Sequence, residues 1–218
     1  GKPLVQHVWD RCRECSNLAF LTVATDDDRI AEAVTAWGGH VTMTREDHPS
    51  GTDRAAEVAS AFPEMTHILN IQGDEPLIDP GLIDALAAAL IADPGLPMIT
   101  AANPVAASDP VLADPNVVKV VIDRDGNALY FSRSQIPHPR NVPDDLVCYR
   151  HKGLYGFRRD FLFDFVAWPP SLLERTEGLE QLRALENGAR IRVVLTDDTS
   201  PGVDTPEQAA ILHDSLSR

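Results

Sequence analysis

The chain has 218 residues, of which 44% are hydrophobic and 24% are charged, the balance of a globular protein rather than a disordered one. Its net charge of −14 argues against a protein that binds nucleic acid through general attraction to phosphates. No apolar run approaches the length of a membrane span, and three scattered cysteines are too few for a disulfide framework, which favours a reducing cytoplasm.

The first half of the chain alternates apolar runs with amphipathic or alanine-rich segments. Cys12 and Cys15 have the CxxC spacing of redox and zinc sites, but they fall on an amphipathic first helix, where two core thiols are the better interpretation. The predicted strands cover residues 18–24, 40–43, 66–71 and 99–103, and two predicted helices cover residues 52–61 and 80–92. A further helix is predicted through Ile30, Ala33, Val34 and Trp37, with its N-cap and first-turn acids supplied by residues 25–28. This rhythm predicts a doubly wound, mostly parallel α/β sheet, in which ligands bind at the carboxyl ends of strands.

The second half has a different pattern. Residues 117–122 and 128–131 flank the turn 123–126 and predict a β-hairpin. Further along we predict a strand at 151–157, helices at 160–166 and 173–187, a strand at 191–195 and a C-terminal helix at 205–216. We interpret residues 1–218 as one α/β domain, with a smaller lobe inserted at about 117–170.

Two acidic segments are candidates for a metal site. Asp74 and Glu75 follow a predicted buried strand, where Mg²⁺ bound by few carboxylates could complete its shell with phosphate oxygens and water. Asp204 lies between Gly202 and Pro206 in a second constrained segment. Each has a structural alternative, since the first segment is also a turn and Asp204 could simply cap the last helix. Glu75 is either a second ligand or a structural anchor.

Four further segments are weak signals taken singly. The polar loop 44–54 leads into a helix whose N-terminal amides favour anions, although a solvated loop explains it equally well. Arg133 follows an aromatic strand and suits a carboxylate, but a surface ion pair is commoner. The segments at 151–155 and 179–183 would each be structural or solvated if considered alone.

Together, the motifs resemble those of the 3-deoxy-manno-octulosonate (Kdo) cytidylyltransferases, also called CMP-Kdo synthetases. The resemblance spans nearly the whole chain in order, which makes it specific. It rests on TDDDRI at residues 25–30, the loop 44–54, NIQGDEP at 70–76, PNVVK at 115–119, ALYFSR at 128–133, HKGLY at 151–155, LEQLR at 179–183 and GVDTPE at 202–207.

The resemblance implies a nucleotidyltransferase-like, Rossmann-like fold and a role for each motif. Asp74 and Asp204 would be the catalytic, Mg²⁺-binding residues. The residues implied to bind the cytidine of CTP are Arg45, His48, Ser50, Gly51, Arg54 and Gln72. Those implied to bind Kdo are Arg133, which would face the sugar carboxylate, and His151, Tyr155, Glu180 and Gln181. The family is usually a homodimer that pairs through the inserted lobe.

The implied reaction is attack of the anomeric hydroxyl of Kdo on the α-phosphorus of CTP, with release of pyrophosphate, for lipopolysaccharide assembly. No histidine stands out as a base for that hydroxyl. The family also begins with a strand and a phosphate loop upstream of the segment that Gly1-Lys2-Pro3 matches, so we expect that loop to precede Gly1. The alternatives are a cytidylyltransferase for sialic acid or 8-amino-Kdo, or a non-catalytic nucleotide- or sugar-binding module.

Overall fold

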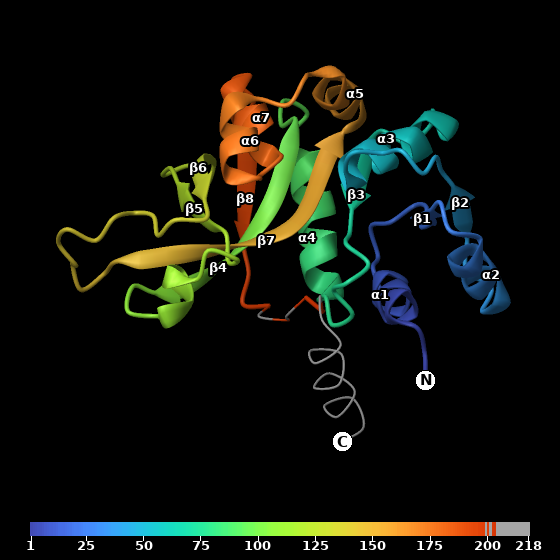
Figure 1. The fold of residues 1–218 in the computed structure, drawn as a ribbon, viewed down its shortest axis with the longest axis horizontal. Coiled ribbons are helices and arrows are strands. Elements are labelled where there is room, and N and C mark those ends of the chain that lie inside the picture. Colours follow the sequence, from blue (N-terminus) through green and yellow to red (C-terminus); the bar gives the residue numbers. More distant parts are fainter. Residues whose placement is uncertain (199, 201, 204–218) are drawn as a thin grey trace.

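The computed structural model describes residues 1–198, 200 and 202–203 (Figure 1). Asp204 and the helix predicted at 205–216 lie outside the described residues. None of the helices in the described part is both long enough and apolar enough to cross a membrane.

The first half of the chain contains four helices and three short strands within these bounds. They are α1 (Leu4–Cys12), β1 (Val23–Thr25), α2 (Asp28–Ala36), β2 (Val41–Met43), α3 (Gly51–Ala61), β3 (His67–Asn70) and α4 (Pro80–Ala92). Side chains cap three of the helices, since Asp27, Ser50 and Asp79 each accept hydrogen bonds from backbone N–H groups of the first turn. Local sequence therefore sets where α2, α3 and α4 begin.

The second half contains the longer strands. Its elements are β4 (Met98–Ala106), the 3₁₀ helix η1 (Pro110–Ala113), β5 (Lys119–Ile122), β6 (Ala128–Ser132), β7 (Val147–Arg158), α5 (Arg159–Ala167), α6 (Leu172–Glu177), α7 (Gln181–Glu186) and β8 (Ile191–Leu195). The predicted hairpin is confirmed, since β5 and β6 pair antiparallel and Gly126 turns the chain with a φ of 79°.

Strand β7 organises the main sheet, whose order is β6-β5-β7-β4-β8 with β3 also paired to β7. Strand β7 runs antiparallel to β3, β4 and β5, while β4 and β8 are parallel. Strands β3, β4 and β8 therefore share one direction, with β7 inserted against them. Strands β1 and β2 form a separate parallel pair.

Helices cover both faces of the main sheet. The side chains of β4 point alternately to one face and the other, and each face packs against helices. Met98 and Ala102 belong to a core that includes residues of α3, α5 and α7, whereas Ile99 and Ala101 belong to a second core with residues of α1 and α4. Figure 1 shows α4 against the sheet and α5, α6 and α7 beside it. The predicted α/β layering is thus observed, whereas the lobe boundaries at 117–170 stay a prediction.

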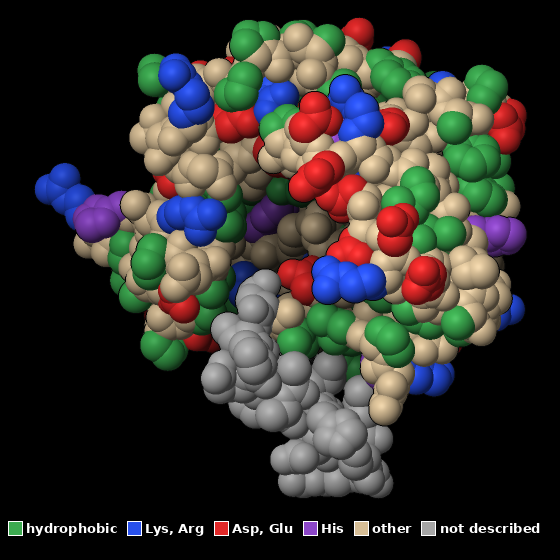
Figure 2. Space-filling view, turned by 45° about the vertical axis from the view of Figure 1, so that its right-hand side comes forward, with side chains coloured by type: hydrophobic (Ala, Val, Ile, Leu, Met, Phe, Trp, Pro, Cys, Tyr) green, Lys and Arg blue, Asp and Glu red, His purple; other side chains and the backbone are tan. Residues whose placement is uncertain are grey.

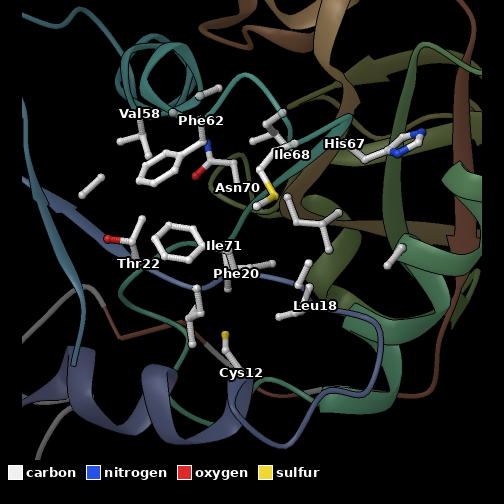
Figure 3. Close-up of a pocket in the computed structure, with 18 of the residues that line it drawn as sticks. Cys12, Leu18, Phe20, Thr22, Val58, Phe62, His67, Ile68, Asn70 and Ile71 are labelled. Atoms are coloured by element: carbon white, nitrogen blue, oxygen red, sulfur yellow. The ribbon is translucent and has the colours of Figure 1, made fainter. Parts of the chain in front are cut away.

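A cavity of about 530 Å³ lies between the strand pair and the main sheet. Its walls come from α1, the segment 17–24, α3, β3 and α4. Figure 3 shows the rings of Phe20 and Phe62 in it, with the amide of Asn70 at one side. The cavity continues to Gly51, Arg54 and Gln72, three of the residues expected to bind the nucleotide.

Four predicted elements were wrong in extent. The strands predicted at 99–103 and 151–157 are too short, since β4 covers Met98–Ala106 and β7 covers Val147–Arg158. The strand predicted at 18–24 is confined to Val23–Thr25, because residues 18–22 line the cavity and have no strand partner within the described chain. The helix predicted at 173–187 is two helices, because Gly178 adopts a left-handed φ of 64° and ends α6.

The cysteines behave as core thiols, as predicted. Cys12 is buried and Cys15 is partly buried, and both are free. Burial raises the pKa of Cys12 to about 12 and that of Cys15 to about 11, so both side chains stay protonated at neutral pH. A reactive or zinc-binding pair would need thiolates instead.

Candidate active site

Several residues expected to bind the nucleotide gather where β3 ends and α3 begins. Ser50 caps α3, and its hydroxyl accepts from the N–H groups of Thr52 and Asp53. A Cβ added at Gly51 would lie 3.6 Å from Asn70 Nδ2 and 3.8 Å from Gln72 Nε2. These amides therefore lie in contact distance of the N-terminus of α3, a position that favours anionic ligands.

The loop before α3 is fastened to that helix by Glu57. The buried His48 ring pairs with the Glu57 carboxylate, and Glu57 also accepts from the Arg45 N–H at 3.1 Å. The hydrogen bond from His48 lowers the pKa of Glu57, which keeps that carboxylate ionised. The Arg45 guanidinium remains 68% exposed, so it can reach a ligand, whereas His48 is committed to Glu57.

Arg54 connects α3 to the segment that follows β1. Its guanidinium is 3.2 Å from the Asp26 carboxylate and donates to the Thr44 hydroxyl. Asp26 belongs to the TDDDRI motif, which is separate in sequence from the loop 44–54. The contact between them could not be predicted from either motif alone. The contact makes Arg54 a residue that holds two loops together at the edge of the cavity.

Two of the residues expected to bind the sugar acid lie side by side on β7. The rings of His151 and Tyr155 are 5.6 Å apart, and the ring of Phe131 meets His151 edge-on at 4.9 Å. His151 Nε2 is 2.9 Å from the Thr100 hydroxyl. Burial lowers the pKa of His151 to about 3 and raises the pKa of Tyr155, so both side chains are neutral at physiological pH.

Glu180 and Gln181 bring α7 to the same region. Glu180 Oε1 accepts a 2.6 Å hydrogen bond from the Thr52 hydroxyl, which joins the predicted sugar residues to the helix of the predicted nucleotide residues. Burial raises the pKa of Glu180. Gln181 is 1% exposed, and its Nε2 has no hydrogen-bond partner among the described residues. A buried amide left unpaired in this way is available to a ligand.

The guanidinium of Arg133, which is expected to bind the carboxylate of the sugar acid, already makes hydrogen bonds within the protein. Its guanidinium donates to the carbonyls of Glu177 at 2.7 Å, Pro115 at 3.1 Å and Gly178 at 3.4 Å. Its N–H donates to the Glu177 carboxylate. Arg133 thus fixes the turn after α6, and contact with the sugar carboxylate stays a prediction.

Asp74 lies beside the segment that leads to Asp204. The Val203 N–H donates to the Asp74 carbonyl at 2.7 Å, and a Cβ added at Gly202 would lie 3.9 Å from Asp74 Oδ2. Asp204 itself lies outside the described residues, so its predicted role remains untested. Glu75 Oε2 lies 3.6 Å from Lys152 Nζ, which supports the structural anchor over the second metal ligand. Burial is the main cause that raises the pKa of Glu75.

The carboxylate of Asp74 is the type of ligand that Mg²⁺ binds in proteins. In the described part of the chain, three or more His, Cys, Asp or Glu side chains nowhere converge as a metal site. Magnesium binds through one or two carboxylates and takes its other ligands from substrate phosphates and water. The Asp74 carboxylate next to the small Gly202 fits that requirement.

Sequence reasoning assigned no individual role to four residues that shape this region: Thr52, Asn70, Lys152 and Asp198. Lys152 is buried and contacts both Glu75 and Asp198. A lysine within a predicted strand was a signal of an ion pair, but its partners are distant in sequence. Asn70 belongs to the NIQGDEP motif and has an unpaired Nδ2 among the described residues.

One face of the molecule is hollowed. Figure 2 shows a deep recess with histidine at its floor and both acidic and basic side chains around its rim. A recess with charges of both signs suits a polyanion bound together with a cation.

Comparison with known proteins identifies the family. The family model described as "Cytidylyltransferase" matches residues 1–191. A 3-deoxy-manno-octulosonate cytidylyltransferase of Pelobacter propionicus is 52% identical over 217 residues, which cover 95% of this chain and 84% of the relative. The enzyme of the same name from Geobacter metallireducens is 50% identical over 228 residues, covering 100% of this chain and 89% of the relative.

Solved structures agree with these relatives. The structure of a CMP:2-keto-3-deoxy-manno-octonic acid synthetase complexed with CTP superposes with a TM-score of 0.95 at 42% identity, covering 100% of this chain and 88% of that one. A 4-diphosphocytidyl-2C-methyl-D-erythritol synthase of Anaerococcus prevotii has a TM-score of 0.65 at 14% identity, covering 100% of this chain and 87% of that one, and so shares the fold. The predicted nucleotidyltransferase-like fold is confirmed, and the chain belongs to the cytidylyltransferase family, among the 3-deoxy-manno-octulosonate cytidylyltransferases.

Proposed function

We propose that this protein transfers CMP from CTP to the anomeric hydroxyl of Kdo, yielding CMP-Kdo and pyrophosphate for lipopolysaccharide assembly. The observation that carries the proposal is the Thr52–Glu180 hydrogen bond of 2.6 Å, since it joins the two sets of residues expected to bind the two substrates. The names of the relatives and the CTP complex of the similar structure support the same reaction.

The residues of this chain would act mainly by positioning charged groups. A neutral hydroxyl attacking a polyanion needs alignment and charge neutralisation more than covalent catalysis. The net charge of −14 opposes the approach of CTP, so nearby cations such as the exposed Arg45 and the N-terminus of α3 must offset it. His151 stays neutral, so it would serve as a hydrogen-bonding group and not as a cationic partner.

Mg²⁺ belongs to the proposal, with Asp74 as a ligand and Asp204 as the second ligand implied by the family resemblance. Magnesium bound there supplies positive charge against the phosphates and the leaving pyrophosphate. Asp74 would hold it next to Gly202, where an added Cβ would lie 3.9 Å from Asp74 Oδ2.

A cytoplasmic location and a homodimer are also proposed, on the family resemblance and, for the location, the free cysteines. Light scattering coupled to size-exclusion chromatography tests the dimer, and a monomeric mass at micromolar concentration would refute it.

The decisive experiment is pyrophosphate release by the full-length protein with CTP, Mg²⁺ and a panel of ulosonates. We expect turnover with Kdo, dependence on Mg²⁺, and loss of at least about a hundredfold in turnover on Asp74→Asn with the fold intact. Asp125→Asn, at an exposed turn residue, is the matched control and should keep full turnover. Unchanged Mg²⁺-dependent turnover in Asp74→Asn would remove the proposed metal role.

The same panel decides between Kdo and related acids. A preference for sialic acid or for 8-amino-Kdo would replace the proposed substrate while leaving the cytidylyltransferase assignment in place.

A further inference from the structure

Two segments far apart in sequence meet at the Asp74 loop. At one end, the Val203 N–H donates to the Asp74 carbonyl at 2.7 Å. At the other, Asp198 Oδ2 accepts from the Asp79 N–H at 3.3 Å. The loop that carries the proposed metal ligand Asp74 therefore contacts the segment that follows β8 at two points, Val203 and Asp198.

A buried ammonium group lies between these two segments. Lys152 Nζ contacts the Asp198 carboxylate at 3.2 Å, the Asp198 and Ser200 carbonyls at 3.3 Å each, and the Ser200 hydroxyl at 3.1 Å. On the other side it meets the Glu75 carboxylate at 3.6 Å. The side chain of Lys152 is 3% exposed, and those of Glu75 and Asp198 are 13% and 8% exposed.

This arrangement points to a role beyond charge balance. Lys152 enters the cluster from β7, which is fixed in the sheet by its pairing with β4. Its contacts reach one segment through Glu75 and the other through Asp198 and Ser200. The sheet thereby fixes the position of both segments relative to each other.

We propose that Lys152 is a positioning residue for the cation site, tying the Asp74 loop to the segment after β8 and holding Glu75 away from the metal. This inference rests on the proposed function, because it takes Asp74 as the metal ligand. Groups that orient a ligand typically change metal affinity by about 10–100-fold when they are removed. Lys152 does so here through two segments and without touching the metal.

A purely structural role for Lys152 predicts a different outcome. Loss of an ammonium between two buried carboxylates destabilises the fold whether or not a metal site lies nearby. Metal affinity therefore has to be measured separately from stability. Mn²⁺ binding followed by electron paramagnetic resonance does this with CTP present and no sugar acid, so that no turnover occurs.

The test compares Lys152→Met and Lys152→Arg with the unsubstituted full-length protein. We expect Mn²⁺ to bind Lys152→Met about tenfold or more weakly and the Mg²⁺ concentration for half-maximal turnover to rise in parallel. Lys152→Arg keeps the charge and several donors, so it should remain within about threefold. Arg183→Met removes another buried ion pair, with Glu174, and should leave Mn²⁺ affinity unchanged.

A double variant covers the case in which Lys152→Met does not fold. Lys152→Met combined with Glu75→Gln removes the ammonium together with one carboxylate that it neutralises. We expect it to be more stable than Lys152→Met but still weak in Mn²⁺ binding, because the contacts of Lys152 with Asp198 and Ser200 are missing. Normal Mn²⁺ affinity in whichever of these variants folds would overturn the inference.

Asp74→Asn separates failure of this inference from failure of the metal assignment. If Asp74→Asn binds Mn²⁺ normally, Asp74 is not the ligand and the inference falls with that assignment. If Asp74→Asn loses Mn²⁺ and Lys152→Met keeps it, only the role of Lys152 is wrong.

Discussion

His151 should make the protein sensitive to acid, and the effect is measurable by substitution. The centroid of its ring is 4.9 Å from that of Phe131 and 5.6 Å from that of Tyr155, and its Nε2 has a hydrogen-bond partner in the Thr100 hydroxyl. Burial lowers its pKa from the ordinary 6.5 to about 3. As the pH falls, His151 therefore becomes protonated near pH 6.5 in the unfolded chain, whereas in the folded chain it stays neutral until the pH approaches 3.

This difference in pKa between the folded and unfolded chain sets the direction in which stability changes with pH. His151 gives its full stabilisation above pH 6.5 and loses it as the pH falls from 6.5 towards 3. Each pH unit below 6.5 lowers the free energy of unfolding by about 1.4 kcal/mol, so the loss is roughly 2.7 kcal/mol at about pH 4.5. Because the residue is partly exposed, we expect solvent to reduce this loss to about 2 kcal/mol.

The assay is urea unfolding of the unsubstituted protein and His151→Gln between about pH 7 and pH 4.5. Gln cannot take up the proton, so the variant should be the less stable protein at pH 7 and the difference should shrink by about 2 kcal/mol at the lower pH. His138→Gln, at an exposed histidine, is the control and should leave the pH dependence unchanged. A His151→Gln difference that is constant with pH would refute the reasoning.

Three further substitutions test the packing and capping that position the site, each by urea or thermal unfolding. Gly156→Ala places a Cβ 2.6 Å from Ile99 Cγ2 and 2.7 Å from Leu69 Cδ2, so it should cost about 1–3 kcal/mol; a neutral result would mean that the sheet yields there. Ser50→Ala removes the cap of α3 and should cost about 1 kcal/mol, whereas unchanged stability would show that water replaces the cap. Arg183→Met removes the cation from the largely buried Glu174 carboxylate and should cost about 3–5 kcal/mol, and a loss below 1 kcal/mol would contradict that reasoning.

Sequence predicted the elements whose signals are local. The helix α4 begins with Asp79 as cap and Pro80 in its first turn, and its bounds match the prediction at 80–92. The helix at 173–187 was predicted without a break, because Gly178 in a helical pattern is ambiguous until its backbone conformation is known. The strand at 18–24 was over-extended because an apolar run shows burial but does not reveal whether a neighbouring strand is there to pair.

The site was predicted less completely, because its contacts depend on the fold. Family motifs led to Asp74, Glu180 and His151, and a motif identifies a residue without giving its partner. Lys152 lies in one of those motifs, yet its importance comes from Asp198, 46 residues further along the chain. A charged residue in a buried strand signals that a partner exists.

The link between the two predicted substrate sites depends on such a distant contact. Thr52 is fully buried in the first turn of α3 and donates to Glu180, which is 128 residues away and at the start of α7. The N-terminus of α3 carries positive partial charge that favours anions, and the buried carboxylate of Glu180 meets that helix end through Thr52. The hydrogen bond between Thr52 and Glu180 therefore links the two predicted substrate sites directly.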